Sequence, residues 1–155
     1  MKKISAIILS AATALSVCAC GGGKANIGDC SGYIQRDIKW DMTIEDIEST
    51  IEHKKNDGVQ DLENGSKTYA FGDAEMQSLN GTAVYNISET VNLFSFVFYD
   101  KVFVDAWYEN YFVKKFGPGK KAGEDTSYQY PALLDGEKCI FTLYLDQDRI
   151  SVKKD

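Results

Sequence analysis

The side chains best suited to chemistry in this sequence are four cysteines and a single histidine, His53. Cys18 and Cys20 form a C-x-C pair that supplies two thiolates, so a tetrahedral zinc site would need both remaining cysteines, Cys30 and Cys139. His53 falls in the polar last turn of a predicted helix, and no serine or cysteine has an evident catalytic partner. We therefore expect no catalytic residue, no bound metal and no cofactor.

The N-terminal segment resembles the signal region of bacterial lipoproteins. Lys2 and Lys3 precede an apolar run over residues 4–17, whose 14 residues are fewer than the roughly 20 that a membrane-spanning helix needs. Val17-Cys18-Ala19 followed by Cys20 is similar to the lipobox of that family, which has an aliphatic residue, a small residue before the cut and then a cysteine. The resemblance implies a signal peptide over residues 1–19. It also implies a diacylglycerol and an N-acyl chain on Cys20, while the alternative is an ordinary secreted protein cut before Gly21.

Such an anchor would place the mature chain outside the cytoplasm, held on a membrane by lipid. Removing residues 1–19 takes away two lysines and no acids, so the net charge changes from −6 to −8. The phosphates of nucleic acids repel an acidic body, and we expect no nucleic acid partner. Residues 20–32 are predicted to be a flexible, glycine-rich tether, and residues 33–155 to be a single domain.

Cys30 and Cys139 are the two cysteines left in the mature chain besides Cys20. Disulfides persist outside the cytoplasm, so these two residues are the natural pair. In the chain-entropy model, closing a loop of 110 residues contributes about 4–5 kcal/mol of stability. The alternative is a pair of free, buried thiols.

One amphipathic helix is predicted over residues 43–55. Ile44, Ile47 and Ile51 share one face at helical spacing. Thr43 suits the N-cap position, and Asp46 stands where the acid of a capping box belongs. The run of residues 56–58, Asn-Asp-Gly, is expected to end the helix.

The rest of the chain favours an antiparallel sheet, which makes the expected fold class α+β with the helix packed on a β-meander. Strands are predicted over residues 67–72, 82–88, 93–99 and 102–108, because these runs are rich in aromatic and β-branched residues. The last two would form a hairpin turning at Asp100-Lys101, apolar on both faces. A short second helix is expected over 109–116, and a C-terminal hairpin over 138–145 and 149–153.

The opening W-x-M-T-x-E-D-I helix, residues 40–47, followed by a meander, resembles the small lipoprotein domains related to BamE, the SmpA/OmlA type. It resembles the β-lactamase inhibitory protein fold more loosely. The resemblance implies a non-catalytic domain that binds another envelope or extracellular protein through its sheet or loops. Tyrosine suits such interfaces, so Tyr99, Tyr108 and Tyr144 are the candidate contact surface. The alternatives are a small-ligand or solute-binding lipoprotein and an anchored hydrolase.

Overall fold

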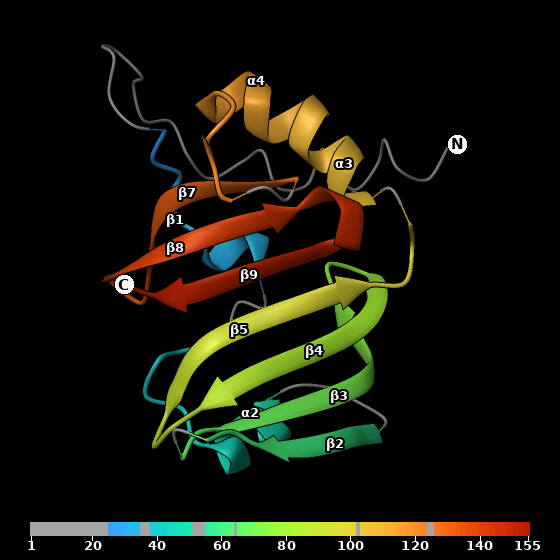
Figure 1. The fold of residues 1–155 in the computed structure, drawn as a ribbon, viewed down its shortest axis with the longest axis vertical. Helices are drawn as coiled ribbons and strands as arrows, with labels where there is room; N and C mark the ends of the chain where they lie inside the picture. The colour runs from blue at the N-terminus through green and yellow to red at the C-terminus, as the bar shows by residue number, and fades with distance from the viewer. Residues whose placement is uncertain (1–24, 35–37, 51–54, 64, 102, 124–125) are drawn as a thin grey trace.

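The chain folds as an α+β protein in which one large sheet packs against helices (Figure 1). This computed structural model describes residues 25–34, 38–50, 55–63, 65–101, 103–123 and 126–155. Within those residues the sheet has nine strands in the order β1-β7-β8-β9-β5-β4-β3-β2, with β6 paired to β7 off this path. The strands are β1 (Gly28–Asp29), β2 (Lys55–Asp61), β3 (Lys67–Met76), β4 (Leu79–Ile87), β5 (Val91–Phe98), β6 (Lys120–Lys121), β7 (Ser127–Leu134), β8 (Glu137–Tyr144) and β9 (Arg149–Lys154).

The sheet is mixed, because β1 runs parallel to β7 while the other pairings are antiparallel. The α+β class is thus confirmed, and the expectation of a purely antiparallel sheet was wrong. The strands predicted at 67–72, 82–88 and 93–99 are present as parts of β3, β4 and β5, and the C-terminal hairpin is β8 and β9 around the 3-10 turn η4 (Leu145–Gln147). The β5–β9 pairing, with Phe96 in register with Ile150, joins the two halves of the sheet.

A helix of 14 residues occupies 103–116, in place of the predicted strand over 102–108. It comprises α3 (Phe103–Trp107), a π-helical turn η3 (Tyr108–Phe112) and α4 (Val113–Phe116). The prediction of a hairpin turning at Asp100-Lys101 was therefore wrong. The helix predicted over 109–116 is present, and it starts earlier, at Phe103. Burial of apolar side chains explains this difference. A strand over these residues would carry apolar side chains on both of its faces, whereas the helix places its buried side chains on the side that packs on the sheet. The helix ends at Gly117, whose φ of 82° suits glycine.

The predicted first helix is present as α2, which spans Ile44–Thr50 within the described residues, and Lys55, its expected last residue, belongs to β2. Residues 51–54, with Ile51 and His53, lie outside the described part of the chain. The end expected at 56–58 was wrong, because these residues belong to β2, which pairs with β3 through a register shift between Asn56 and Gly58. The capping box is confirmed: the Thr43 N–H and hydroxyl donate to Asp46 Oδ2 at 2.8 and 2.9 Å, which lowers the pKa of Asp46.

The N-terminal part of the described chain belongs to the sheet. The Ile27 N–H donates to the Pro131 carbonyl at 3.1 Å, and the Cys30 N–H to the Leu133 carbonyl at 2.8 Å. Ile27 and Cys30 are both buried, and the 3-10 turn η2 (Ser31–Tyr33) follows directly. The expectation of a flexible tether reaching to residue 32 was therefore wrong from Ile27 onward, because backbone pairing with β7 holds this segment.

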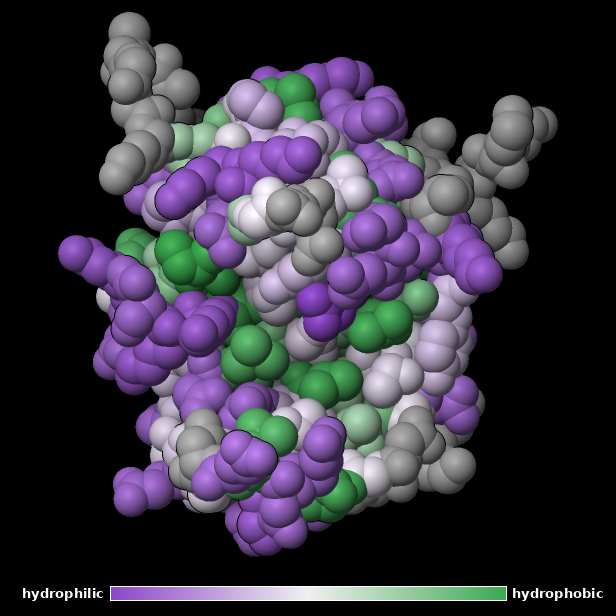
Figure 2. Space-filling model, viewed as in Figure 1, coloured by the Kyte–Doolittle hydropathy of each residue, from purple (hydrophilic) through white to green (hydrophobic). Residues whose placement is uncertain are grey.

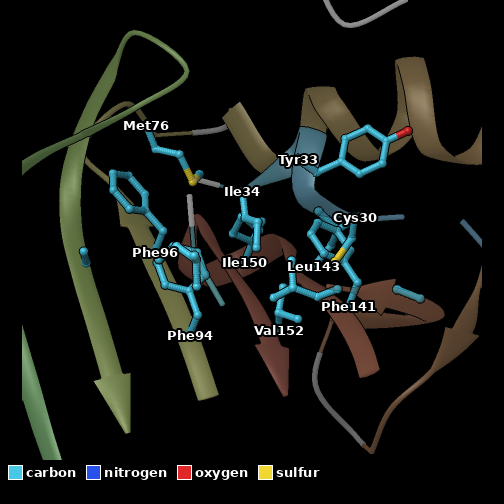
Figure 3. Packing of buried hydrophobic residues seen from close by; sticks show 14 of the residues in the cluster. Cys30, Tyr33, Ile34, Met76, Phe94, Phe96, Phe141, Leu143, Ile150 and Val152 are labelled. Carbon is cyan, nitrogen blue, oxygen red and sulfur yellow. The ribbon is translucent and has the colours of Figure 1, made fainter. Parts of the chain in front are cut away.

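The two faces of the sheet have different environments. Side chains alternate along each strand, and one face carries the buried set Phe94, Phe96, Phe141, Leu143, Ile150 and Val152. Figure 3 shows Tyr33 and Ile34, from the N-terminal segment, lying over this set. Helix 103–116 packs on the same face, with the Phe112 ring stacked on Phe141 at 5.4 Å between centroids. We call this side the covered face.

Candidate functional site

The other side of the sheet, which we call the open face, is where Figure 1 and Figure 2 look onto the molecule. In Figure 1 the segment containing η2 is drawn behind β8 and β9, so the viewer sees the side that this segment does not cover. In Figure 2 apolar surface gathers over the middle of the sheet, with strongly hydrophilic surface around it. The open face consists of the side chains that alternate with the covered set along β7, β8, β9, β5 and β4.

The strand register arranges the open face in rows that cross the sheet. One row is Gln129, Thr142, Ser151, Ser95 and Val84. Three members of this row, Ser95, Ser151 and Thr142, are buried because they are small and stand between longer neighbours. A second row, on one side of it, is Pro131, Ile140, Lys153, Leu93 and Asn86. A third row, on the other side, is Tyr144, Arg149, Val97 and Thr82.

Aliphatic side chains on this face are only half-buried. Val84, Leu93, Val97 and Ile140 are all of intermediate exposure, and Leu133 is 37% exposed. On the covered face, by contrast, the central side chains of β5, β8 and β9 are fully buried, namely Phe94, Phe96, Phe141, Leu143, Ile150 and Val152. The open face therefore has apolar area still available for burial against a partner.

Arg149 and Tyr144 form the most defined polar feature of the open face. The two residues are registered opposite each other on β9 and β8, and the guanidinium Cζ lies 3.8 Å from the centre of the Tyr144 ring. This stacking fixes the plane of the guanidinium. Its Nε is buried and has no hydrogen-bond partner within the described chain.

The open face is basic, although the chain as a whole has 23 acidic and 17 basic residues. Lys138, Arg149 and Lys153 stand at open-face positions, and Lys120 on β6 is registered with Gln129 beside them. None of the open-face positions of β7, β8, β9, β5 and β4, all of them within the described residues, carries an acid. Acids stand at its margins: Asp29 on β1, Glu75 on β3, and Asp155, which follows β9 and whose N–H donates to the Lys138 carbonyl at 3.3 Å.

The structure places two of the three predicted contact tyrosines near this face. Tyr99 is 53% exposed at the end of β5, and its hydroxyl accepts from the Asp73 N–H at 3.1 Å. Tyr144 lies on the open face under Arg149. Tyr108 is apart from both, because it sits buried on helix 103–116, stacked on Tyr128 with centroids 4.3 Å apart. Burial, together with the neighbouring Tyr128, raises the pKa of Tyr108 to about 12.

Sequence reasoning missed Arg149, Lys138 and Lys153 as members of one surface. The signal was present in the alternation of the C-terminal hairpin, where residues 140, 142 and 144 lie on one side and 139, 141 and 143 on the other. That pattern marks two faces but does not say which partner strands flank them. The register of β9 with β5 supplies the rest of the surface.

The two cysteines predicted to pair lie next to each other on the covered side. Cys30 Sγ and Cys139 Sγ are 3.9 Å apart, both residues are buried, and both are free thiols in the structure. The hydrogen bond between the two sulfurs is the main cause that raises the pKa of Cys30, and burial of the thiol raises it further. The two thiols are thus direct neighbours, while the bond between them stays a prediction. Cys20 lies outside the described residues.

The described residues bring no three metal-binding side chains of the His, Cys, Asp or Glu type together, and none of their helices is long and apolar enough to cross a membrane. The fold and the site define the chain as an α+β protein whose mixed sheet has one covered and one open, basic face. Beyond this class, no protein-family model, no curated protein and no solved structure matches the chain.

Proposed function

We propose that this chain is a lipid-anchored, extracytoplasmic lipoprotein that binds another envelope or extracellular protein, without catalysis, through the open face of its sheet. The observation that carries this proposal is the asymmetry of the sheet. Helix 103–116 and the N-terminal segment pack on one face, while Leu93, Val97 and Ile140 on the other stay half-exposed. A surface of half-exposed aliphatic groups around a stacked arginine is typical of protein interfaces.

The position of the N-terminal segment is consistent with a short anchor on Cys20. Ile27 is fixed to β7 at the edge of the sheet through its hydrogen bond to Pro131. Ile27 is seven positions after Cys20, and a segment of this length reaches at most about 25 Å when fully extended. A lipid on Cys20 would therefore hold the domain close to the membrane surface, with its basic face available to a neighbour on the same membrane.

The solute-binding alternative required space between the aromatic face and residues 109–116. In the structure that space is filled by rings in direct contact. Phe112 lies 5.4 Å from Phe141 and 5.4 Å from Tyr130 between ring centroids, and Tyr33 packs 5.2 Å from Phe112. We therefore favour a protein partner over a small ligand.

Site-specific photocrosslinking tests where the partner binds. With p-benzoylphenylalanine in place of Val97, on the open face, we expect a discrete adduct when the full chain is irradiated in its native membranes. The same probe in place of Lys114, which is exposed on helix 103–116, is the matched control and should give none. Adducts of equal yield from both positions, or none from Val97, would contradict binding through the open face.

The anchor is tested by removing the proposed lipid attachment site. The Cys20→Ala variant should lose the lipid and fail to be processed, so its membrane-bound, lipidated form should disappear from fractionated cells labelled with a fatty acid analogue. Cys18→Ala is the matched control, because Cys18 would be removed with the signal peptide and its loss should leave lipidation unchanged. Lipid labelling of the Cys20→Ala variant at the level of the unaltered protein would refute the anchor.

A further inference from the structure

We propose that the partner segment recognised by the open face is acidic, and that Arg149 binds one of its carboxylates as the central contact. This inference rests on the proposed function and names the chemistry of the partner. It is carried by two independent observations, the distribution of charge over the sheet and the geometry of Arg149.

The charge distribution selects an acidic partner. Lys120, Lys138, Arg149 and Lys153 stand on or beside the open face, whose positions on the five strands from β7 to β4 carry no acid. The chain nevertheless carries a net charge of −6. Other lysines lie elsewhere on the chain, but a face whose strand positions carry cations and no acid attracts an acidic segment more strongly than the acid-containing remaining surface does. A second copy meeting this face with its own open face would instead bring like charges together.

The geometry of Arg149 provides a specific contact for a carboxylate. Its guanidinium is held flat on the Tyr144 ring at 3.8 Å, and its backbone is registered with Val97 on the other side. A guanidinium binds a carboxylate in its own plane through two parallel N–H groups. Arg149 is part-exposed, and because its Nε has no hydrogen-bond partner in the described chain, the chain itself leaves this guanidinium incompletely paired.

A polypeptide fits this face better than a lipid headgroup does. Asn86, in the row that contains Lys153 and Leu93, has a buried Oδ1 that lacks a hydrogen-bond partner among the described residues. An acidic peptide offers backbone N–H donors to this acceptor and side-chain carboxylates to Arg149, whereas the phosphodiester of a lipid headgroup offers acceptors only. Leu93 and Val97 are half-buried, which suits contact with a chain laid across the strands better than insertion into acyl chains.

Fluorescence anisotropy with labelled poly-L-glutamate tests this proposal on the full-length protein in neutral detergent. We expect saturable binding, weakened at higher salt because exposed charges are screened beyond about 10 Å at 0.1 M salt. Arg149→Gln should weaken binding by about ten-fold or more, since it removes one partner of a close charge pair. Arg149→Lys, which keeps the charge and loses the planar donors, should recover only a small part of that loss.

Two further variants control for folding and for bulk charge. Lys114→Gln removes the same charge from helix 103–116 and should change the dissociation constant by less than about two-fold. Lys138 and Lys153 are exposed, so the double variant Lys138→Gln/Lys153→Gln should fold normally and still weaken binding. Absence of saturable binding, or equal losses for Arg149→Gln and Lys114→Gln, would overturn the proposal.

Two outcomes separate this inference from the proposed function. If the Val97 crosslink to a partner forms but is unaffected by salt and by Arg149→Gln, the protein partner stands and its acidic character fails. If vesicles of phosphatidylglycerol bind as tightly as poly-L-glutamate with the same dependence on Arg149, the face binds anionic lipid and the inference is overturned. If poly-L-glutamate binds as expected while Val97 yields no adduct in native membranes, the recognition of carboxylates holds and the proposed site of partner binding fails.

Discussion

Replacing Phe112 by alanine is expected to lower the free energy of unfolding by about 3–5 kcal/mol. Phe112 is fully buried, and its ring is the point at which helix 103–116, the N-terminal segment and the sheet meet. Its ring centroid lies within 5.5 Å of those of five neighbours on η2, β7, β8 and its own helix: Tyr33, Tyr130, Phe141, Trp107 and Tyr111. Removing the ring leaves a cavity between several elements that cannot all move in to fill it. The loss of unfolding free energy should therefore be among the larger values seen when a core side chain is truncated.

Urea unfolding followed by tryptophan fluorescence measures this effect, because Trp107 packs edge-on against Phe112 with centroids 5.1 Å apart. Phe116→Ala is the matched control: it removes the same ring from the end of the same helix, where the side chain is only half-buried. We expect the control to cost clearly less than Phe112→Ala. Equal losses for the two variants would mean that the helix does not dock on the sheet through Phe112.

The π-helical turn explains why Phe112 occupies this position. In a regular α-helix the residue four after Trp107, which is Tyr111, would lie on the same face. The turn over Tyr108–Phe112 adds one residue, so Phe112 is buried while Tyr111 is only half-buried and its hydroxyl contacts that of Tyr33 at 3.0 Å. Because residues 111 and 112 are both aromatic, the sequence allows either of them to share the buried face with Phe103 and Trp107. The packing of Phe112 on Tyr130 and Phe141 selects Phe112.

The parts of the fold that could be predicted from the sequence are those set by local alternation. The hairpin of β8 and β9 alternates cleanly, and β3, β4 and β5 are rich in β-branched and aromatic residues. Residues 102–108 have the same composition and form a helix, because aromatic side chains suit either structure and the covered face accepts a helix at this point. Strands β1, β2, β6 and β7 were not predicted. The short strand β1 depends on a distant partner, β7, whereas β2 and β7 pair with the next strands along the chain, β3 and β8. Both β2 and β7 contain residues that are untypical of strands, such as Gly58 and Pro131.

The candidate site was less predictable than the fold. Exposed tyrosines were the expected feature, yet Tyr108 turned out to be part of the core and Tyr144 acts as the platform for Arg149. Arg149, Val97 and Thr82 come from three strands and become neighbours only through the β9–β5 and β5–β4 registers. A one-residue slip in either register would place these side chains on opposite faces, and a single sequence does not specify the pairing of strands so far apart.

Oxidation of the Cys30–Cys139 pair is expected to raise the free energy of unfolding by about 4–5 kcal/mol over that of the reduced protein. The two sulfurs already lie 3.9 Å apart, and the bond would close a loop in which the residues are 109 positions apart. The gain arises mainly because the unfolded chain loses conformational freedom. It would also fasten the segment that carries the proposed anchor to β8, so that a pull on the N-terminus is borne by the sheet and not by the two hydrogen bonds of Ile27 and Cys30 alone.

Urea unfolding of the full chain after treatment with oxidised glutathione, compared with the same protein in tris(2-carboxyethyl)phosphine, measures the difference. The double variant Cys30→Ala/Cys139→Ala is the control, and its stability should not depend on the reductant. Mass spectrometry of proteolytic fragments should show the peptides containing Cys30 and Cys139 joined after oxidation. Recovery of both peptides separately, each alkylated by iodoacetamide, would mean that the two thiols stay reduced at 3.9 Å and that the sheet holds the N-terminal segment without a covalent bond.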